Sequence, residues 1–263
     1  MMTKSFFYQN KKIVYRVFGT GMPVILVHGF GEDGTVWDQQ AEYLKENFKV
    51  IIPDLPGSGQ SELIDDMSIE GMAEVIHSII HEEDIDACPV IGHSMGGYIT
   101  LALVEKYYNH VSAFGLFHSS AFADSEEKIA TRRKGIAFIK EHGGFEFLKT
   151  ATPNLFSTTT KDERPELIDE QIASLSSFSG AALVSYYEAM IQRPDRTNIL
   201  KEATVPVLFA MGKYDNAIPL ADGLKQCHLP EKSYIHILQQ SGHMGMLEET
   251  EKTNLLLEKF LLQ

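Results

Sequence analysis

The sequence has few cysteines and no long apolar stretch. Cys88 and Cys227 are its only cysteines, and neither has C-x-x-C or Cys/His spacing, so we expect two reduced thiols and no metal site. No apolar run reaches the ~18 residues that a membrane-spanning helix needs, and Met1–Asn10 lacks the apolar core of a signal peptide. These absences predict a cytoplasmic protein without a membrane segment.

Basic side chains are also scarce. Lys and Arg together number 23 against 36 Asp and Glu, which gives a formal net charge of −13. Nucleic acids and anionic membranes bind through Lys and Arg, so neither is expected as a partner. The charge is unevenly distributed: between Ser120 and Arg196 10 basic residues face 12 acidic ones, whereas the remainder of the chain has 13 basic and 24 acidic residues. The cluster Arg132-Arg133-Lys134 in this segment fits either a solvated helix face or a docking point for an acidic substrate or acyl carrier.

Short apolar runs rich in β-branched residues alternate with helical patterns along most of the chain. This alternation is typical of α/β proteins, in which helices cover both faces of a mostly parallel sheet and ligands bind at the carboxyl ends of the strands. The first two runs also fit an antiparallel hairpin around Asn10. The predicted strands are 6–8, 13–18, 24–27, 50–52, 90–91, 113–117, 207–211 and 234–238, and the predicted helices are 37–47, 69–84, 94–108 and 249–262.

The alternation of predicted strands with helices stops after Phe117 and resumes at Val207. Helical patterns cover 128–142, 165–178 and 181–192 within this interval, with breaks at 142–144, 157–160 and 193–194. We therefore predict a core of residues 1–119 and 197–263, with a helical cap of residues 120–196 inserted above the carboxyl edge of the sheet.

The segment Val90–Gly97 joins a strand end, a G-x-S-x-G pentapeptide and a helix start. This succession predicts a nucleophile elbow, in which Ser94 occupies a sharp, strained turn with its hydroxyl at the carboxyl edge of the sheet. Gly92 and Gly96 lie two residues on either side of the serine, where strand and helix approach too closely for larger side chains.

A serine hydroxyl is a poor nucleophile at neutral pH and needs a base that is itself oriented by an acid. Asp215 and His243 follow the last two predicted strands, so both can reach the edge at which Ser94 lies. The chain order Ser, Asp, His is the order expected for this architecture. Two backbone N–H groups, those of Phe30 and Met95, are the candidate donors to the oxyanion that forms when the serine attacks a carbonyl.

Five segments together closely resemble the α/β-hydrolase fold superfamily, in particular its single-domain esterase, lipase and C–C-hydrolase-like branch. They are His28-Gly29-Phe30, Asp54–Ser61, Gly92–Gly96, Gly212-x-x-Asp215 and Gly242-His243. The resemblance runs from about Met22 to the carboxyl terminus and is weakest in the cap. It implies a sheet of about eight strands, a Ser94-Asp215-His243 triad, no cofactor and acyl-enzyme chemistry. Because the nucleophile position holds serine and not aspartate, the similar haloalkane dehalogenases and epoxide hydrolases are disfavoured.

The predicted function is hydrolysis of a small or medium ester, thioester or related acyl compound by a serine carboxylesterase-like enzyme. His118, Arg132 and Tyr187 are candidate substrate contacts, although His118 also fits a structural histidine. Three alternatives stay open: C–C cleavage or elimination on a carboxylated substrate held by Arg132 or Arg133, demethylation of an ester on an acidic acyl carrier, and a small-molecule receptor with little turnover. Acyl length and oligomeric state are not encoded in any pattern that the sequence displays.

Overall fold

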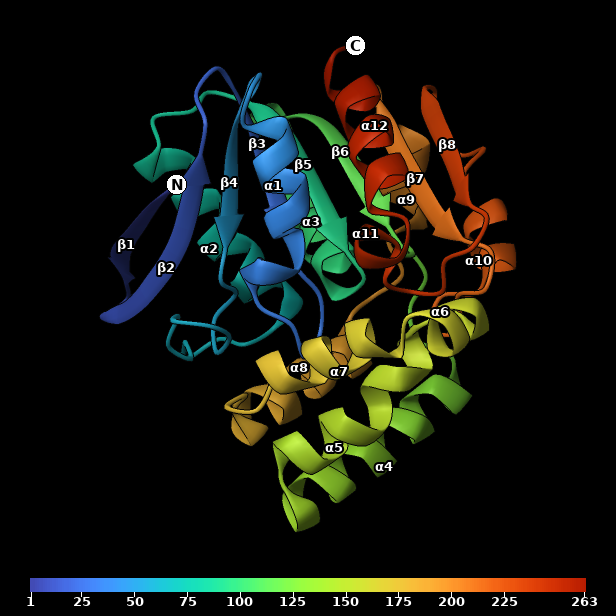
Figure 1. The fold of residues 1–263 in the computed structure, drawn as a ribbon. Helices are drawn as coiled ribbons and strands as arrows, with labels where there is room; N and C mark the ends of the chain where they lie inside the picture. Colours follow the sequence, from blue (N-terminus) through green and yellow to red (C-terminus); the bar gives the residue numbers. More distant parts are fainter.

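The computed structural model describes residues 1–263 as one eight-stranded sheet between helices, with a helical insertion at one end (Figure 1). The strand order is β1-β2-β4-β3-β5-β6-β7-β8; β2 pairs antiparallel with β1 and β4, and every other pair is parallel. The strands are β1 (Met2–Tyr8), β2 (Lys11–Phe18), β3 (Met22–Val27), β4 (Phe48–Pro53), β5 (Cys88–His93), β6 (Val111–Phe117), β7 (Val207–Gly212) and β8 (Ser233–Leu238). The predicted α/β class and all eight predicted strands are confirmed.

The amino-terminal hairpin is confirmed as well. Gln9 and Asn10 have φ angles of +48° and +65°, so both adopt the left-handed conformation that a two-residue turn between twisted antiparallel strands requires.

Helices cover both faces of the sheet (Figure 1). Because side chains alternate along a strand, Val24 and Leu26 pack into one buried cluster with residues of α1 and α12, while Ile25 and Val27 pack into another with residues of α2 and α3. The helices of the core are η1 (Gly34–Trp37), α1 (Asp38–Leu44), α2 (Ile69–Glu82), α3 (Met95–Tyr107), η2 (Tyr108–His110), α10 (Leu220–Leu224), α11 (Gly245–Glu248) and α12 (Thr250–Leu261).

A helical insertion separates β6 from β7 and lies at the end of the sheet where the parallel strands terminate (Figure 1). Its elements are α4 (Glu126–His142), α5 (Gly144–Ala151), η3 (Thr152–Leu155), α6 (Thr158–Glu163), α7 (Pro165–Ser174), α8 (Gly180–Gln192) and α9 (Thr197–Glu202). We call α4 to α8 the cap; the division of the chain at 120 and 196 stays a prediction.

The predicted break at 157–160 is wrong, because a helix begins there. Ser157 is the N-cap of α6, and its hydroxyl accepts a hydrogen bond from the Thr160 N–H at 3.2 Å. The break at 142–144 is a single turn at Gly143, whose φ of +91° suits glycine, and α5 starts at the next residue.

None of these helices combines the length and the apolar character that crossing a bilayer would take.

Candidate active site

Ser94 lies in a strained turn between β5 and α3. Its φ of +51° and ψ of −117° are unusual for a residue with a side chain, and two hydrogen bonds fix this backbone. The Ser94 N–H donates to the Phe117 carbonyl at 2.9 Å, and the Ser94 carbonyl accepts from the Ser119 hydroxyl at 2.7 Å. The turn therefore has the geometry of the predicted elbow.

The two glycines of the pentapeptide are required by close backbone approaches. A Cβ atom built on Gly92 would lie 2.2 Å from the Gly96 carbonyl carbon, and one built on Gly96 would lie 2.5 Å from the Val27 carbonyl oxygen. Neither contact can be relieved by a side-chain rotation, because the opposing atoms belong to the backbone. The strand, the turn and the helix can pack this closely only with glycine at both positions.

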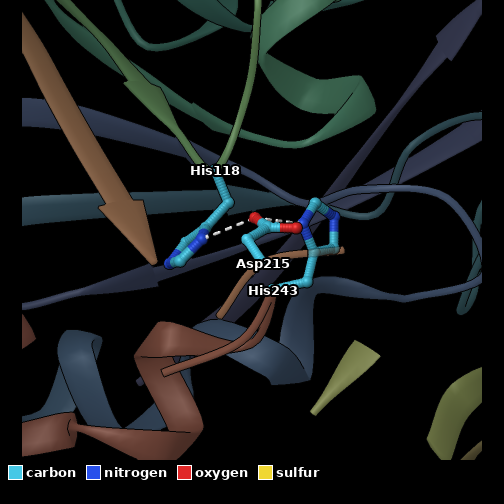
Figure 2. Close-up of side chains that lie close together, drawn as sticks. All are labelled: His118, Asp215 and His243. Atoms are coloured by element: carbon cyan, nitrogen blue, oxygen red, sulfur yellow. Dashed lines mark hydrogen bonds and ion pairs between the residues drawn. The ribbon is translucent and has the colours of Figure 1, made fainter. Parts of the chain in front are cut away.

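Asp215 and His243 form a buried hydrogen-bonded pair. Nδ1 of His243 lies 2.8 Å from Oδ2 of Asp215, whose other oxygen accepts hydrogen bonds from the N–H groups of Ala217 and Ile218 at 2.9 and 2.8 Å. Oδ2 also lies 3.0 Å from Nδ1 of His118 (Figure 2). The carboxylate is thus surrounded by four donors.

These contacts shift the pKa values of both partners. Burial lowers the pKa of His243, but the charge of Asp215 and its hydrogen bond outweigh this effect and leave that pKa above the ordinary histidine value. Burial raises the pKa of Asp215, whereas His243 and His118 hold it well below the usual carboxyl range. Asp215 is therefore a carboxylate at neutral pH.

The loop after β3 lies directly beside the elbow. A Cβ built on Gly29 would lie 3.1 Å from the Cβ of Ser94. The buried carboxylate of Glu32 accepts a hydrogen bond from the Gly29 N–H at 2.7 Å and lies 2.9 Å from Nδ1 of His93. Burial raises the pKa of Glu32, but His93 and the Gly29 N–H bring it below its ordinary value. Glu32 therefore holds this loop as a carboxylate.

The backbone N–H groups of the two predicted oxyanion donors are available to donate to a new hydrogen-bond partner. The Phe30 N–H donates to no acceptor within the protein, and Met95 is the first residue of α3, so its N–H has no acceptor within the helix. The Phe30 side chain stacks on Tyr187 of the cap, with ring centroids 4.2 Å apart. The cap thus contacts the loop that carries one of these donors.

The loop that carries His243 is tied to the cap through Glu248. Oε1 of Glu248 accepts a hydrogen bond from the Gly242 N–H at 2.8 Å, and Oε2 accepts from the Ser157 N–H at 2.8 Å and from the Thr160 hydroxyl at 2.7 Å. The His243 N–H donates to the Leu155 carbonyl at 2.6 Å. The position of His243 therefore depends on residues on either side of the start of α6.

A cavity of about 420 Å³ lies between the core and the cap and reaches Ser94 and His243. Among the predicted substrate contacts, Arg132 and Tyr187 line this cavity and His118 does not. Residues that the sequence analysis did not single out also line it, chiefly from α4 and from the segment after Asp215; they include Glu32, Tyr98, Lys128, Leu155, Met190 and Asn216. They come from segments far apart in the sequence, so only the packing of these segments in the folded chain identifies them.

The Arg132 guanidinium in this cavity is already paired. Its Nε and Nη2 donate to the buried Asp124 carboxylate at 2.5 and 3.2 Å, and Arg193 also donates to Asp124, at 3.0 Å. One carboxylate thus faces two guanidinium groups, so the cluster keeps a net positive charge beside the cavity. Arg133 and Lys134, the rest of the basic cluster, are exposed on α4.

The side chains of His118, Asp215 and His243 also have the donor atoms of a metal site. One ligand atom from each lies within 4.8 Å of the others, and all three residues are buried. The hydrogen bonds of His243 and His118 to Asp215 already account for this clustering, because they bring both rings to one carboxylate.

Comparisons with known proteins agree with the fold. A family model described as the alpha/beta hydrolase fold matches residues 22–134. A thermophilic esterase from Thermogutta terrifontis superposes with a TM-score of 0.93 at 26% identity, over 99% of this chain and 98% of that chain.

Two curated relatives, each 25% identical to this chain, are named for different functions. Karrikin insensitive 2 receptor IA from Petunia hybrida is 25% identical over 93% of this chain and 92% of its own length. The dihydrolipoyllysine-residue acetyltransferase component of an acetoin cleaving system from Pseudomonas putida is 25% identical over 92% of this chain, which spans 64% of that protein. The sheet order, the helical insertion and the match to the esterase along nearly the whole chain agree: the protein has the α/β-hydrolase fold with a helical insertion.

Proposed function

We propose that the protein is a serine hydrolase that cleaves small or medium carboxylic esters, thioesters or related acyl compounds. The observation that carries this proposal is the shared cavity: the strained Ser94 and the Asp215-bound His243 line one space between core and cap. The similarity to an esterase over almost the full chain supports the same reaction class.

In the proposed reaction His243 takes the Ser94 proton as the hydroxyl attacks the substrate carbonyl. Asp215 stabilises the imidazolium that forms, and the N–H groups of Phe30 and Met95 donate to the oxyanion. The leaving group departs with the proton from His243 and leaves an acyl group on Ser94. Water then adds to this acyl-enzyme, again with His243 as base, and the carboxylic acid is released.

Labelling with a fluorophosphonate tests the proposal directly, because such probes phosphonylate an activated serine. We expect the probe on the peptide that contains Ser94, and none in the Ser94→Ala protein. Thr131→Ala is the matched control, since it removes another hydroxyl from the cavity lining and should label like the unaltered protein. Folded wild-type protein that takes up no probe would contradict an activated serine at this position.

The pH dependence of the hydrolysis follows from the raised pKa of His243. The base must be neutral to accept the Ser94 proton, so activity is lost as the pH falls through this pKa. We expect kcat/KM to decrease on the acid side with a midpoint above the ordinary histidine value of about 6.5. Initial rates with a p-nitrophenyl ester between pH 5 and 9 measure it; a midpoint clearly below that value would contradict the role of His243.

A carboxylated substrate, cleaved at an ester or at a C–C bond, is the second candidate. Arg132 favours it, because its guanidinium lines the cavity within a cluster of net positive charge. We expect Arg132→Gln to lower kcat/KM about tenfold or more for an ester whose acyl chain ends in a carboxylate, and to change it little for the uncharged ester of equal length. Equal losses for the two esters would assign Arg132 a structural role only.

Two further candidates concern partners. Exposed Arg133 and Lys134 would suit an acidic acyl carrier, whose binding should weaken steeply with salt. A receptor function, as in the Petunia hybrida relative, would instead show slow, near single-turnover kinetics and a partner that binds only with ligand present. Steady-state rates across p-nitrophenyl esters of increasing acyl length distinguish an esterase. Many turnovers per protein molecule would exclude a receptor that reacts only once, and an optimum in acyl length would report the size of the cavity.

A further inference from the structure

Asp215 shares a single carboxylate oxygen between two imidazoles. Its Oδ2 lies 2.8 Å from Nδ1 of His243 and 3.0 Å from Nδ1 of His118, and the two rings lie on opposite sides of the carboxylate (Figure 2). His243 lines the cavity, whereas His118 does not. His118 therefore acts on the site through Asp215 and not by touching a substrate.

The His118 ring is fixed by its backbone and by tight packing, and it makes one polar contact. His118 is buried, directly follows β6 and has a φ of +47°. Its backbone N–H donates to the Ala210 carbonyl at 2.8 Å. Two glycines leave the space that the ring occupies: a Cβ on Gly212 would lie 2.7 Å from its Cε1, and one on Gly245 would lie 2.4 Å from its Nε2. Asp215 is the only hydrogen-bond partner of the imidazole.

The protonation of His118 follows from these partners. An ionised carboxylate only accepts hydrogen bonds, so Nδ1 of His118 carries a proton. Nε2 is buried without a partner, and a proton there would leave a donor unsatisfied on a buried charged ring. Burial lowers the pKa of His118 and prevails over the opposing effect of Asp215. The ring is accordingly neutral, with its proton on Nδ1.

We propose that His118 is a positioning residue that draws part of the Asp215 charge away from His243 and so weakens the hold of His243 on the proton it takes from Ser94. The inference rests on the proposed function. The positive end of the His118 N–H dipole points at the oxygen that stabilises the His243 imidazolium, so less negative charge is left for that imidazolium. The carboxylates of Glu32 and Glu248 act in the opposite direction, and the His93 ring lies 4.9 Å from that of His243. His118 thus keeps the base neutral at a lower pH than these neighbours would allow.

Two variants separate this role from simple packing. His118→Phe keeps a ring and removes the donor, whereas His118→Asn keeps a donor near the position of Nδ1 and tolerates a positive φ. We expect the titration midpoint of His243, followed by NMR of its ring, to rise by about half to one pH unit in the Phe variant and to move little in the Asn variant. The acid limb of kcat/KM should shift by the same amount. An unchanged midpoint in the folded Phe variant would overturn the proposal.

The unaltered protein supplies a second test that does not depend on folding of the variants. Nitrogen-15 NMR of the histidine rings should show His118 neutral with its proton on Nδ1 near neutral pH, and a proton on Nε2 would overturn the proposal. Both NMR readouts need no turnover. Wild-type protein that hydrolyses no ester would therefore count against the proposed function, while the His243 midpoint would still decide the role of His118.

Discussion

Ser94→Ala is expected to reduce ester turnover by about 10⁴- to 10⁶-fold, because no acyl-enzyme can form without the Ser94 hydroxyl. The hydroxyl makes no hydrogen bond within the protein, so its removal leaves no partner unsatisfied and the melting temperature should change little. Burst and steady-state rates with a p-nitrophenyl ester give the effect, and thermal unfolding confirms that the variant is folded.

Thr131→Ala again serves as the control, since Thr131 lines the same cavity but its hydroxyl donates to the Glu127 carbonyl of its own helix. Its rates should stay within about threefold of the wild-type rates, because the Thr131 hydroxyl has no part in the proposed reaction. A Ser94→Ala protein with wild-type turnover would remove Ser94 from the mechanism and leave the strained turn without a catalytic purpose.

Asp215→Asn is expected to reduce kcat by about 10⁴-fold with the fold intact. The reason lies in the four donors around this side chain. An asparagine must turn its oxygen toward the N–H groups of Ala217 and Ile218, which places its NH₂ group against Nδ1 of His243. That nitrogen must then accept, the proton moves to Nε2, and the imidazole no longer has a lone pair for the Ser94 proton.

The exposed Asp65 provides the matched control, because Asp65→Asn makes the same chemical change far from any hydrogen bond of the site. We expect no measurable loss of kcat there. If Asp215→Asn kept kcat within tenfold of wild type, the orienting acid would have to be another residue, and Glu32 would be the first to examine, since it is a buried carboxylate that lines the same cavity.

Much of the fold could be predicted because its signals are local. Each strand of the parallel sheet is a short apolar run, and the elbow at Ser94 combines a strand end, two glycines and a helix start within eight residues. The roles of Ser94, Asp215 and His243 remain predictions, although Asp215 and His243 do come together as expected.

What the sequence did not reveal depends on contacts between distant segments. The start of α6 at Ser157 is fixed partly by Glu248, which lies 91 residues further along the chain. The contact of His118 with Asp215 joins residues 97 apart and requires β6 to lie beside β7, which the run of apolar residues in each strand does not specify. The lining of the cavity by α4 is likewise set by how the cap packs, and no periodicity within α4 encodes it.

The bridging carboxylate of Glu248 has a consequence for engineering this protein. One of its oxygens accepts a hydrogen bond from the Gly242 N–H, and the other accepts from Ser157 and Thr160 at the start of α6, so this part of the cap helps to fix the position of His243, the proposed base. A chimera built to change substrate preference should therefore exchange α4, α5 and α8 and retain 155–160 with the recipient core. A graft that replaced the whole insertion would also replace residues 155–160, which contact the His243 loop. Any change in specificity could then not be separated from the effect of a displaced His243 imidazole.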